Sequence, residues 1–279
     1  MKTLLLAILT AATASAFTAA DRLGLQMYSL RVQMMQQGWR PALDQAKAFG
    51  FTAIESSPPR NVTPEQYTAD LASRGIKLIS EGFGYEALEK DVAGCVAQAR
   101  ALGAQYVMVA WIPHKNDTFT AEEAAKAAAD FNAWGAAFKA AGITFVYHAH
   151  GYEFRPLAGG DNLFDSIVRS TNPEYVNFEM DVFWVTHGGQ DATKLLMKYP
   201  DRWRLMHVKD IRKGAPTGIY TGHAPATDDV SVGSGQVDWP SVLREAKAVG
   251  IQWYFIEDES VTPMQNIPQS IAYIKSLGI

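Results

Sequence analysis

Acidic and imidazole side chains stand at the ends of short apolar runs along this 279-residue chain. Five such residues are His148, His150, Asp181, His207 and Glu257. Carboxylate oxygens and imidazole nitrogens together form mixed ligand sets that suit Mn²⁺, Mg²⁺, Co²⁺ or Zn²⁺. Without a cation, carboxylates brought together would repel one another and shift their pKa values upward. The pattern therefore predicts that one divalent metal ion is held where these runs meet.

The elements that must position these residues follow a repeating order. Eight β-like runs alternate with helix-like runs, and they cover residues 23–29, 51–55, 76–81, 105–110, 143–148, 175–181, 203–209 and 252–257. Strands that alternate with helices pair in parallel, and eight such units in about 250 residues suit a closed (β/α)8 TIM barrel. A doubly wound open sheet is the alternative, but no glycine-rich phosphate loop follows the first run. We expect a single α/β domain over residues 21–279.

The chemistry of such a barrel lies at the C-terminal ends of its strands. Because side chains alternate between the two faces of a strand, His148 and His150 share one face, and Glu179 shares a face with Asp181. His207 likewise shares a face with Lys209. Taken alone, a histidine in a strand is usually a hydrogen-bonded core residue, and a terminal acid often caps the next helix. The recurrence of such residues on at least five strands favours a functional site.

The first twenty residues read as a secretory signal peptide. Lys2 precedes a short apolar run over residues 4–14, and small residues follow at Ala14 and Ala16. We predict cleavage after Ala16, with Ala20 as the second choice, and a secreted or periplasmic protein. The alternative is an N-terminal core helix, but the run is too short to span a bilayer.

Composition argues against binding to nucleic acid, an internal disulfide and insertion into a membrane. The net charge of −4 argues against nucleic acid, because phosphate-binding proteins normally carry a basic face. The one cysteine, Cys95, has no partner for an internal disulfide. No later segment is long and apolar enough for a membrane, so we expect no insertion after signal cleavage. Nothing in the composition opposes assembly into a homo-oligomer.

Six runs carry a resemblance to a known family. They are residues 24–31 (GLQMYSLR), 147–154 (YHAHGYEF), 178–184 (FEMDVFW), 205–210 (LMHVKD), 232–239 (VGSGQVDW) and 256–258 (IED). With these runs in this order, the chain resembles the sugar phosphate isomerase/epimerase group of xylose isomerase-like TIM barrels, and its secreted branch in particular. The runs span nearly the whole chain after the signal peptide and are specific for the family, but they say little about the substrate.

The resemblance implies a metal bound by Glu, Asp, His and Glu from strands 5 to 8. By position, Asp181, His207 and Glu257 take the last three places. Strand 5 departs from the pattern, because His148 stands where many relatives carry Glu, and the nearest acid is Glu153. Either residue can be the fourth ligand, and we favour Glu153. Two further departures are Ser80-Glu81-Gly82, where many relatives have His, and Ser234, where Glu is frequent.

The resemblance also implies proton abstraction beside the carbonyl of a small carbohydrate, through an enediolate. His148, His150 and Lys209 are then the candidate catalytic residues, and Glu153 is a candidate base if it does not bind metal. Expected substrate-binding residues are Gln26, Tyr28, Arg31, Glu55, Trp111 and Trp184, of which the two tryptophans offer a surface for the apolar face of a sugar.

Four functions fit this resemblance to different degrees, and one of them is binding without catalysis. An aldose–ketose isomerase or epimerase comes first, and a 3-keto-glycoside lyase or hydratase follows closely, because export separates the protein from intracellular sugar phosphates. A sugar-binding barrel without activity is the alternative of another class. A DNA-repair endonuclease ranks low, since export and negative charge both oppose DNA binding.

Overall fold

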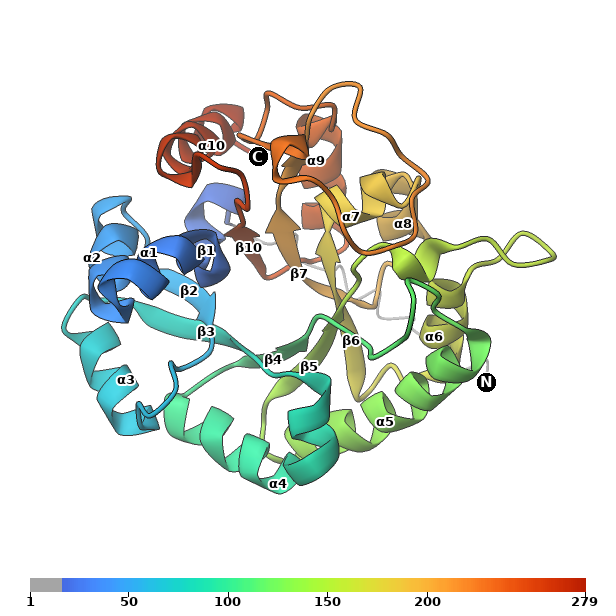
Figure 1. Ribbon diagram of the computed structural model, residues 1–279, viewed down its shortest axis with the longest axis horizontal. Coiled ribbons are helices and arrows are strands. Elements are labelled where there is room, and N and C mark those ends of the chain that lie inside the picture. The colour runs from blue at the N-terminus through green and yellow to red at the C-terminus, as the bar shows by residue number, and fades with distance from the viewer. Residues whose placement is uncertain (1–16) are drawn as a thin grey trace, which may run out of the picture.

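Eight parallel strands close into a barrel in the computed structural model of the chain, which describes residues 17–279 (Figure 1). The barrel strands are β1 (Leu23–Gln26), β2 (Ala53–Ser56), β3 (Lys77–Gly82), β4 (Tyr106–Val109), β5 (Thr144–His148), β6 (Val176–Asp181), β7 (Trp203–Val208) and β10 (Trp253–Ile256). The first and last strands pair, with Gly24 opposite Phe255, and β1 also pairs with β2. This closure confirms the predicted TIM barrel and excludes the open sheet. Most of the predicted signal peptide, residues 1–16, lies outside the described residues.

Helices surround the strands, as Figure 1 shows. They are α1 (Arg31–Gln37), α2 (Trp39–Ala48), α3 (Pro64–Ala72), α4 (Tyr85–Leu102), α5 (Ala121–Ala140), α6 (Leu163–Ser170), α7 (Val182–His187), α8 (Ala192–Lys198), α9 (Trp239–Ala248) and α10 (Pro263–Leu277). Local sequence sets their ends: a capping box between Thr120 and Glu123 begins α5, and Gly103, with a φ of 69°, ends α4 in the left-handed region. Within residues 17–279, no helix is both long enough and apolar enough to span a bilayer.

An apolar plug fills the barrel interior. It consists of Ala53, Ile79, Met108, Val146, Leu205 and Phe255. Because every second residue of a strand faces inward, the next inward position on β2, β5 and β7 falls on Glu55, His148 and His207. The residue after β10 at the same spacing is Glu257. The apolar plug therefore forms a floor, and a polar layer lies directly above it at the C-terminal ends of the strands.

A bulge changes which residue of β3 enters this polar layer. The pairing shifts from Ile54 opposite Leu78 to Glu55 opposite Ser80, so β3 carries one extra residue. Such a bulge reverses the direction of the residues that follow it. Glu81 consequently faces the helices, where its carboxylate accepts a hydrogen bond of 2.5 Å from Gln98 on α4.

A small antiparallel sheet of β8 (Asp210–Ile211) and β9 (Asp229–Val230) anchors the long loop after β7. The buried Asp210 carboxylate accepts hydrogen bonds from the backbone amides of Gly233 and Gly235 and from the indole of Trp239. A Cβ at Gly235 would collide with Asp210. The 232–239 run, which carried part of the family resemblance, therefore has a structural role in fixing this loop.

The chain ends of the described fold meet at the N-terminal side of the barrel. The short helix η1 (Ala19–Arg22) leads directly into β1, and Thr18 caps it in a capping box with Asp21. The Ala19 amide donates a 2.7 Å hydrogen bond to the Ile279 carbonyl. Residues 18–22 are thus part of the packed fold.

Candidate active site

A cavity of about 510 Å³ opens above the polar layer of the barrel. Its lining includes Gln26, Tyr28, Met108, Trp111, His148, His150, Trp184, His207, His223 and Glu257. These residues come from strand ends and from the loops that follow them. The cavity thus lies at the mouth where TIM barrels carry their chemistry.

Two imidazoles and two carboxylates form the upper group of polar residues, at the mouth. Asp181 Oδ2 lies 3.7 Å from His148 Nε2 and 3.6 Å from His207 Nδ1, and Glu257 Oε2 lies 3.2 Å from the same His207 atom. One ligand atom from each of His148, Asp181 and His207 fits within 4.8 Å of the others. Asp181 is 0% exposed, and its Oδ2 has no hydrogen-bond partner within the described chain. A buried carboxylate oxygen without a donor is costly, and a cation at this point would satisfy it.

A second set of acids lies below this group. His207 Nε2 is 2.6 Å from Glu55 Oε1 and 3.4 Å from Glu179 Oε2, and the three residues form another possible metal-binding group. Burial, and then the Glu55 carboxylate, raise the pKa of Glu179 well above its usual value. Burial opposes a charged His207, yet Glu179 and Glu257 outweigh it and hold the pKa of that imidazole well above normal. Glu179 was not among the expected site residues, although its spacing from Asp181 placed it on the same face.

Three of the four expected metal ligands, Asp181, His207 and Glu257, come together, and Glu153 does not join them. Its carboxylate accepts hydrogen bonds from the Tyr147 hydroxyl and, at 3.0 Å, from the His150 amide. Tyr147 belongs to the core between strands and helices, so Glu153 is turned away from the barrel axis. Burial raises the pKa of Glu153 to about 7. On strand 5 it is His148 that lies beside Asp181.

The other two expected catalytic residues flank the upper group. His150 stacks on Trp184, with ring centroids 4.6 Å apart, and burial together with Lys209 lowers the pKa of His150 to about 3. Lys209 is buried, and its ammonium group donates to Glu257 at 3.1 Å and to Glu259. Burial opposes the charge on Lys209, but those two carboxylates hold its pKa well above normal. A neutral imidazole and a fixed cation therefore lie close to the candidate ligands.

Most of the expected substrate-binding residues line the cavity, with two exceptions. Glu55 lies deep in the polar layer and does not line the cavity, and its carboxylate accepts a 2.6 Å hydrogen bond from the Gln26 side-chain amide. Arg31 donates to the carbonyls of Glu259 and Tyr28 and lines a separate cavity of about 210 Å³. Both departures follow from tertiary contacts that spacing along the chain does not reveal.

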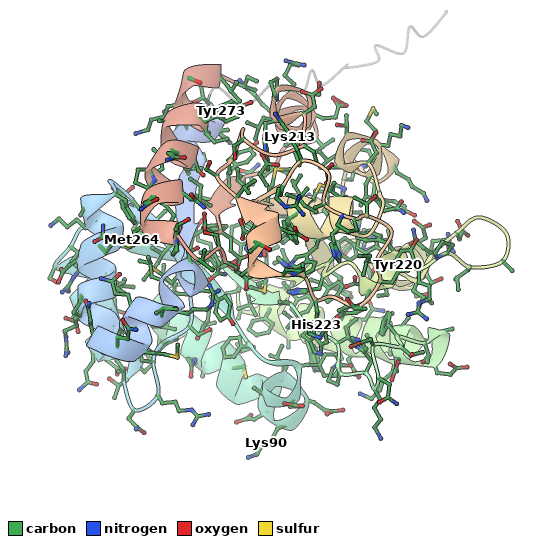
Figure 2. The ribbon with its side chains drawn as sticks, turned by 45° about the horizontal axis from the view of Figure 1, so that its top comes forward. Lys90, Lys213, Tyr220, His223, Met264 and Tyr273 are labelled. Carbon is green, nitrogen blue, oxygen red and sulfur yellow. The ribbon has the colours of Figure 1, made fainter. Side chains whose placement is uncertain are left out.

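Aromatic rings form the upper wall of the cavity. The ring of His114 stacks on Trp111 with centroids 4.8 Å apart, and the ring of His223 lies tilted against Trp111 at 5.5 Å. Figure 2 shows His223, with Lys213 and Tyr220, spaced along the loop that crosses this face of the molecule. His223 was not among the expected residues, because nothing in the loop sequence indicates that the loop folds back onto the mouth.

The fold is a TIM barrel, and its carboxylates and imidazoles gather at the C-terminal mouth. Enzymes with this fold carry their active sites at the same end. The chain belongs to the xylose isomerase-like TIM barrel family, whose family model matches residues 43–277. Members of this family are enzymes that act on carbohydrates. The family resemblance seen in the sequence is thereby confirmed.

The individual relatives share less than a third of their residues with the chain where they align. The chain is 27% identical over 172 residues to an inosose dehydratase of Mesomycoplasma hyopneumoniae, a match that covers 57% of this chain and 56% of that protein. The chain thus spans little more than half the length of that relative. A sugar phosphate isomerase/epimerase from Parabacteroides distasonis has the same fold, with a TM-score of 0.74 and 23% identity over 95% of this chain and 96% of that one.

A third similar protein bears on the metal. The IolI protein was solved with a bound zinc atom, and its structure matches with a TM-score of 0.71 and 14% identity over 92% of this chain and 96% of that one. This likeness establishes the shared fold. The present protein has two possible metal-binding groups of its own at the mouth.

Proposed function

We propose that this protein binds one divalent metal ion through His148, Asp181, His207 and Glu257 and removes a proton from the carbon beside a sugar carbonyl. The observation that carries the proposal is the unpartnered Asp181 Oδ2, buried between the two imidazoles. When bound, the cation supplies Lewis-acid stabilisation of the negative charge that develops on the substrate oxygens. His148 takes the strand-5 place in this set.

The residues around the ligands suit the remaining tasks. The two indoles that line the cavity, Trp111 and Trp184, offer apolar surface on which a sugar ring can rest. We assign the role of base to His150, because its imidazole lines the cavity and lies beside His148, with ring centroids 5.3 Å apart. Lys209 lines the neighbouring cavity together with Arg31, and its ammonium group donates to Glu257 and Glu259, so its role is to hold these two carboxylates in place. Proton transfer by a base such as His150 typically contributes a factor of about 10² to 10⁴ in rate.

The proton that His150 takes has two possible fates. If it returns to the substrate, the product is an isomer or an epimer, and we place this activity first. The second candidate is elimination from a 3-keto sugar or 3-keto glycoside. That activity is supported by the similarity to a protein named as a dehydratase, since removal of water is itself an elimination. Both candidates share the enediolate-forming step.

Proton exchange and metal content test the proposal together. The full-length mature protein is loaded with Mn²⁺ or Zn²⁺, its metal content is measured, and free and keto sugars are incubated with it in D₂O. One bound metal per chain and deuterium incorporation at one carbon beside the carbonyl are expected. A new sugar isomer indicates isomerisation, and an enone product indicates elimination. Absence of both metal and exchange contradicts the proposal and favours a sugar-binding barrel.

We also propose that the protein is exported and that its signal peptide is cut after Ala16. A cut after Ala20 would remove the Thr18 cap and the contact between Ala19 and Ile279, which belong to the packed fold. The intact mass of protein secreted from an expression host distinguishes the two sites. A mature chain that begins at Phe17 is expected, and one that begins at Asp21 or retains Met1 contradicts this assignment.

A further inference from the structure

A second cavity of about 370 Å³ adjoins the main one. Its lining consists of Gln26, Met27, Tyr28, Met34, Gly38, Trp39, Ser56, Ser57 and Pro59. Gln26, Tyr28, Ser56 and Ser57 also line the main cavity, so the two spaces lie side by side with these four residues at their boundary. Figure 1 shows α1 and α2, which supply Met34 and Trp39, lying together beside β1 and β2. We call this second space the side groove.

The two spaces differ in chemistry. The lining of the main cavity includes imidazoles and carboxylates, whereas the lining of the side groove contains no Asp, Glu, Lys, Arg or His. Met34, Trp39 and Pro59 are partly exposed and present apolar surface to it. The Trp39 ring is held in place by Tyr67, 5.4 Å away, and by the Arg40 guanidinium, 4.5 Å from its centroid. The surfaces of Met34, Trp39 and Pro59 favour an apolar group, because such a group gains from every part of its surface that leaves water.

We propose that the side groove is a specificity subsite for an apolar aglycone, and that the substrate is a glycoside whose sugar ring occupies the main cavity. This inference rests on the proposed function, because the sugar must be held at the candidate metal site for its substituent to reach the groove. Gln26 lines both spaces. Its side-chain amide donates to Glu55 in the polar layer, and its side-chain carbonyl accepts a hydrogen bond from the Tyr28 backbone amide.

A glycoside in this orientation directs the chemistry toward elimination. In a 3-keto glycoside, the base takes the proton from C2, and the electron pair of the broken C2–H bond forms an enediolate across C2 and C3. As the C3 carbonyl forms again, that electron pair becomes the C1–C2 double bond while the C1–O bond breaks, and the aglycone takes up a proton and leaves as a free alcohol. The products are an unsaturated keto sugar and an alcohol, so the step consumes no oxidant or reductant. Oxidation of the sugar at C3 must precede it in a separate reaction.

Two substrates with alkoxide leaving groups test the subsite without a large change in chemistry. The metal-loaded mature protein is assayed with methyl and with cyclohexyl 3-keto-β-D-glucopyranoside, by release of the alcohol and by exchange at C2. We expect a KM about tenfold lower for the cyclohexyl substrate, with similar kcat, because the groove binds ground state and transition state alike. Trp39→Ala and Met34→Ala should each raise the cyclohexyl KM and leave the methyl KM unchanged.

The neighbouring methionine is a matched control. Met35 follows Met34 on α1, is 78% exposed and lies outside the groove lining, so Met35→Ala should keep the preference. If Trp39→Ala does not fold, Met34→Ala and the groove-filling Met34→Trp decide the matter. Equal KM values for the two substrates, or a preference that survives both groove variants, overturn the subsite while C2 exchange keeps the proposed function intact. Lack of exchange with either substrate overturns both.

Discussion

Glu55 on β2 and His207 on β7 meet beneath the mouth of the barrel, with Glu55 Oε1 2.6 Å from His207 Nε2. A proton on Nε2 donated to this carboxylate leaves Nδ1 as the nitrogen that faces Asp181 and Glu257. Metal-binding histidines commonly have their second ring nitrogen held in this way by a carboxylate. The buried acid on β2 therefore orients the imidazole that the proposed metal site needs.

Removing this support should weaken metal binding. We expect Glu55→Ala to lower the affinity for Zn²⁺ by about 10- to 100-fold, as measured by competition with a coloured chelator. Glu81→Gln is the matched control, because the bulge in β3 turns that acid toward α4 and away from the mouth. Equal affinities for Glu55→Ala and the native protein would contradict the orienting role.

Metal should also stabilise the fold. A ligand that binds only the folded state raises its stability by about 2.7 kcal/mol at a hundredfold excess over Kd, so added Mn²⁺ or Zn²⁺ should raise the Tm of the native protein. Asp181→Ala should abolish that rise. Glu153→Gln should retain it, since Glu153 is bonded to Tyr147 and to the His150 backbone rather than to the upper group. A loss of the rise in the Glu153 variant would restore Glu153 as a ligand.

The pKa of Glu153 predicts a pH dependence of stability. Burial raises this pKa from 4.5 to about 7, so the folded state favours the protonated carboxyl. Its stabilising contribution is therefore full below about pH 4.5 and is lost as the pH rises toward 7, by about 3 kcal/mol in total.

The Glu153→Gln variant isolates this contribution. Urea unfolding of both proteins between pH 4.5 and 7.5 should show the native protein losing stability relative to the variant as the pH rises. Glu81, whose pKa burial also raises to about 7, is present in both proteins and cancels in the comparison. Two parallel stability curves would exclude the raised pKa.

The proposed base has a kinetic signature. His150→Gln should reduce kcat by about 10² to 10⁴ with little change in KM and an unchanged metal content. His114→Gln serves as a control, because that ring stacks behind Trp111 and does not line the cavity. If kcat falls equally in the two variants, the aromatic wall rather than a proton transfer accounts for the loss.

The loop over the mouth depends on one buried carboxylate. Asp210→Ala would leave the amides of Gly233 and Gly235 and the Trp239 indole without their acceptor. Since each unsatisfied buried donor costs about 1–3 kcal/mol, the loop after β7 should become sensitive to limited proteolysis. Resistance equal to that of the native protein would show that β8 and β9 hold the loop without Asp210.

The barrel could be predicted from the sequence because its signals are local. Alternating strands and helices, and the faces shared by His148 with His150 and by Glu179 with Asp181, need no knowledge of distant contacts. The directions of side chains that follow a turn or a bulge could not be predicted in this way. Glu153 follows the turn at Gly151, whose φ is 96°, and Glu81 follows a bulge, so alternation no longer determines where either points.

Features that arise from packing between distant elements could not be predicted from the sequence either. The side groove forms where α1 and α2 lie beside β1 and β2. Neither helix carries a sequence motif that predicts such a groove. Arg31 was expected in the main cavity, but the carbonyls of Glu259 and Tyr28 draw its guanidinium to a neighbouring space. Such positions depend on partners far away in the chain.

The hydrogen bond between Ala19 and Ile279 has a practical consequence for handling the protein. Because the ends of the fold meet on the side opposite the mouth, a short linker can join them, and the chain can be reopened in the exposed hairpin at Gly159 and Gly160. Such a circular permutant would keep every barrel strand whole. Immobilisation of the unpermuted protein through either end of the fold would likewise leave the mouth of the barrel open to solvent.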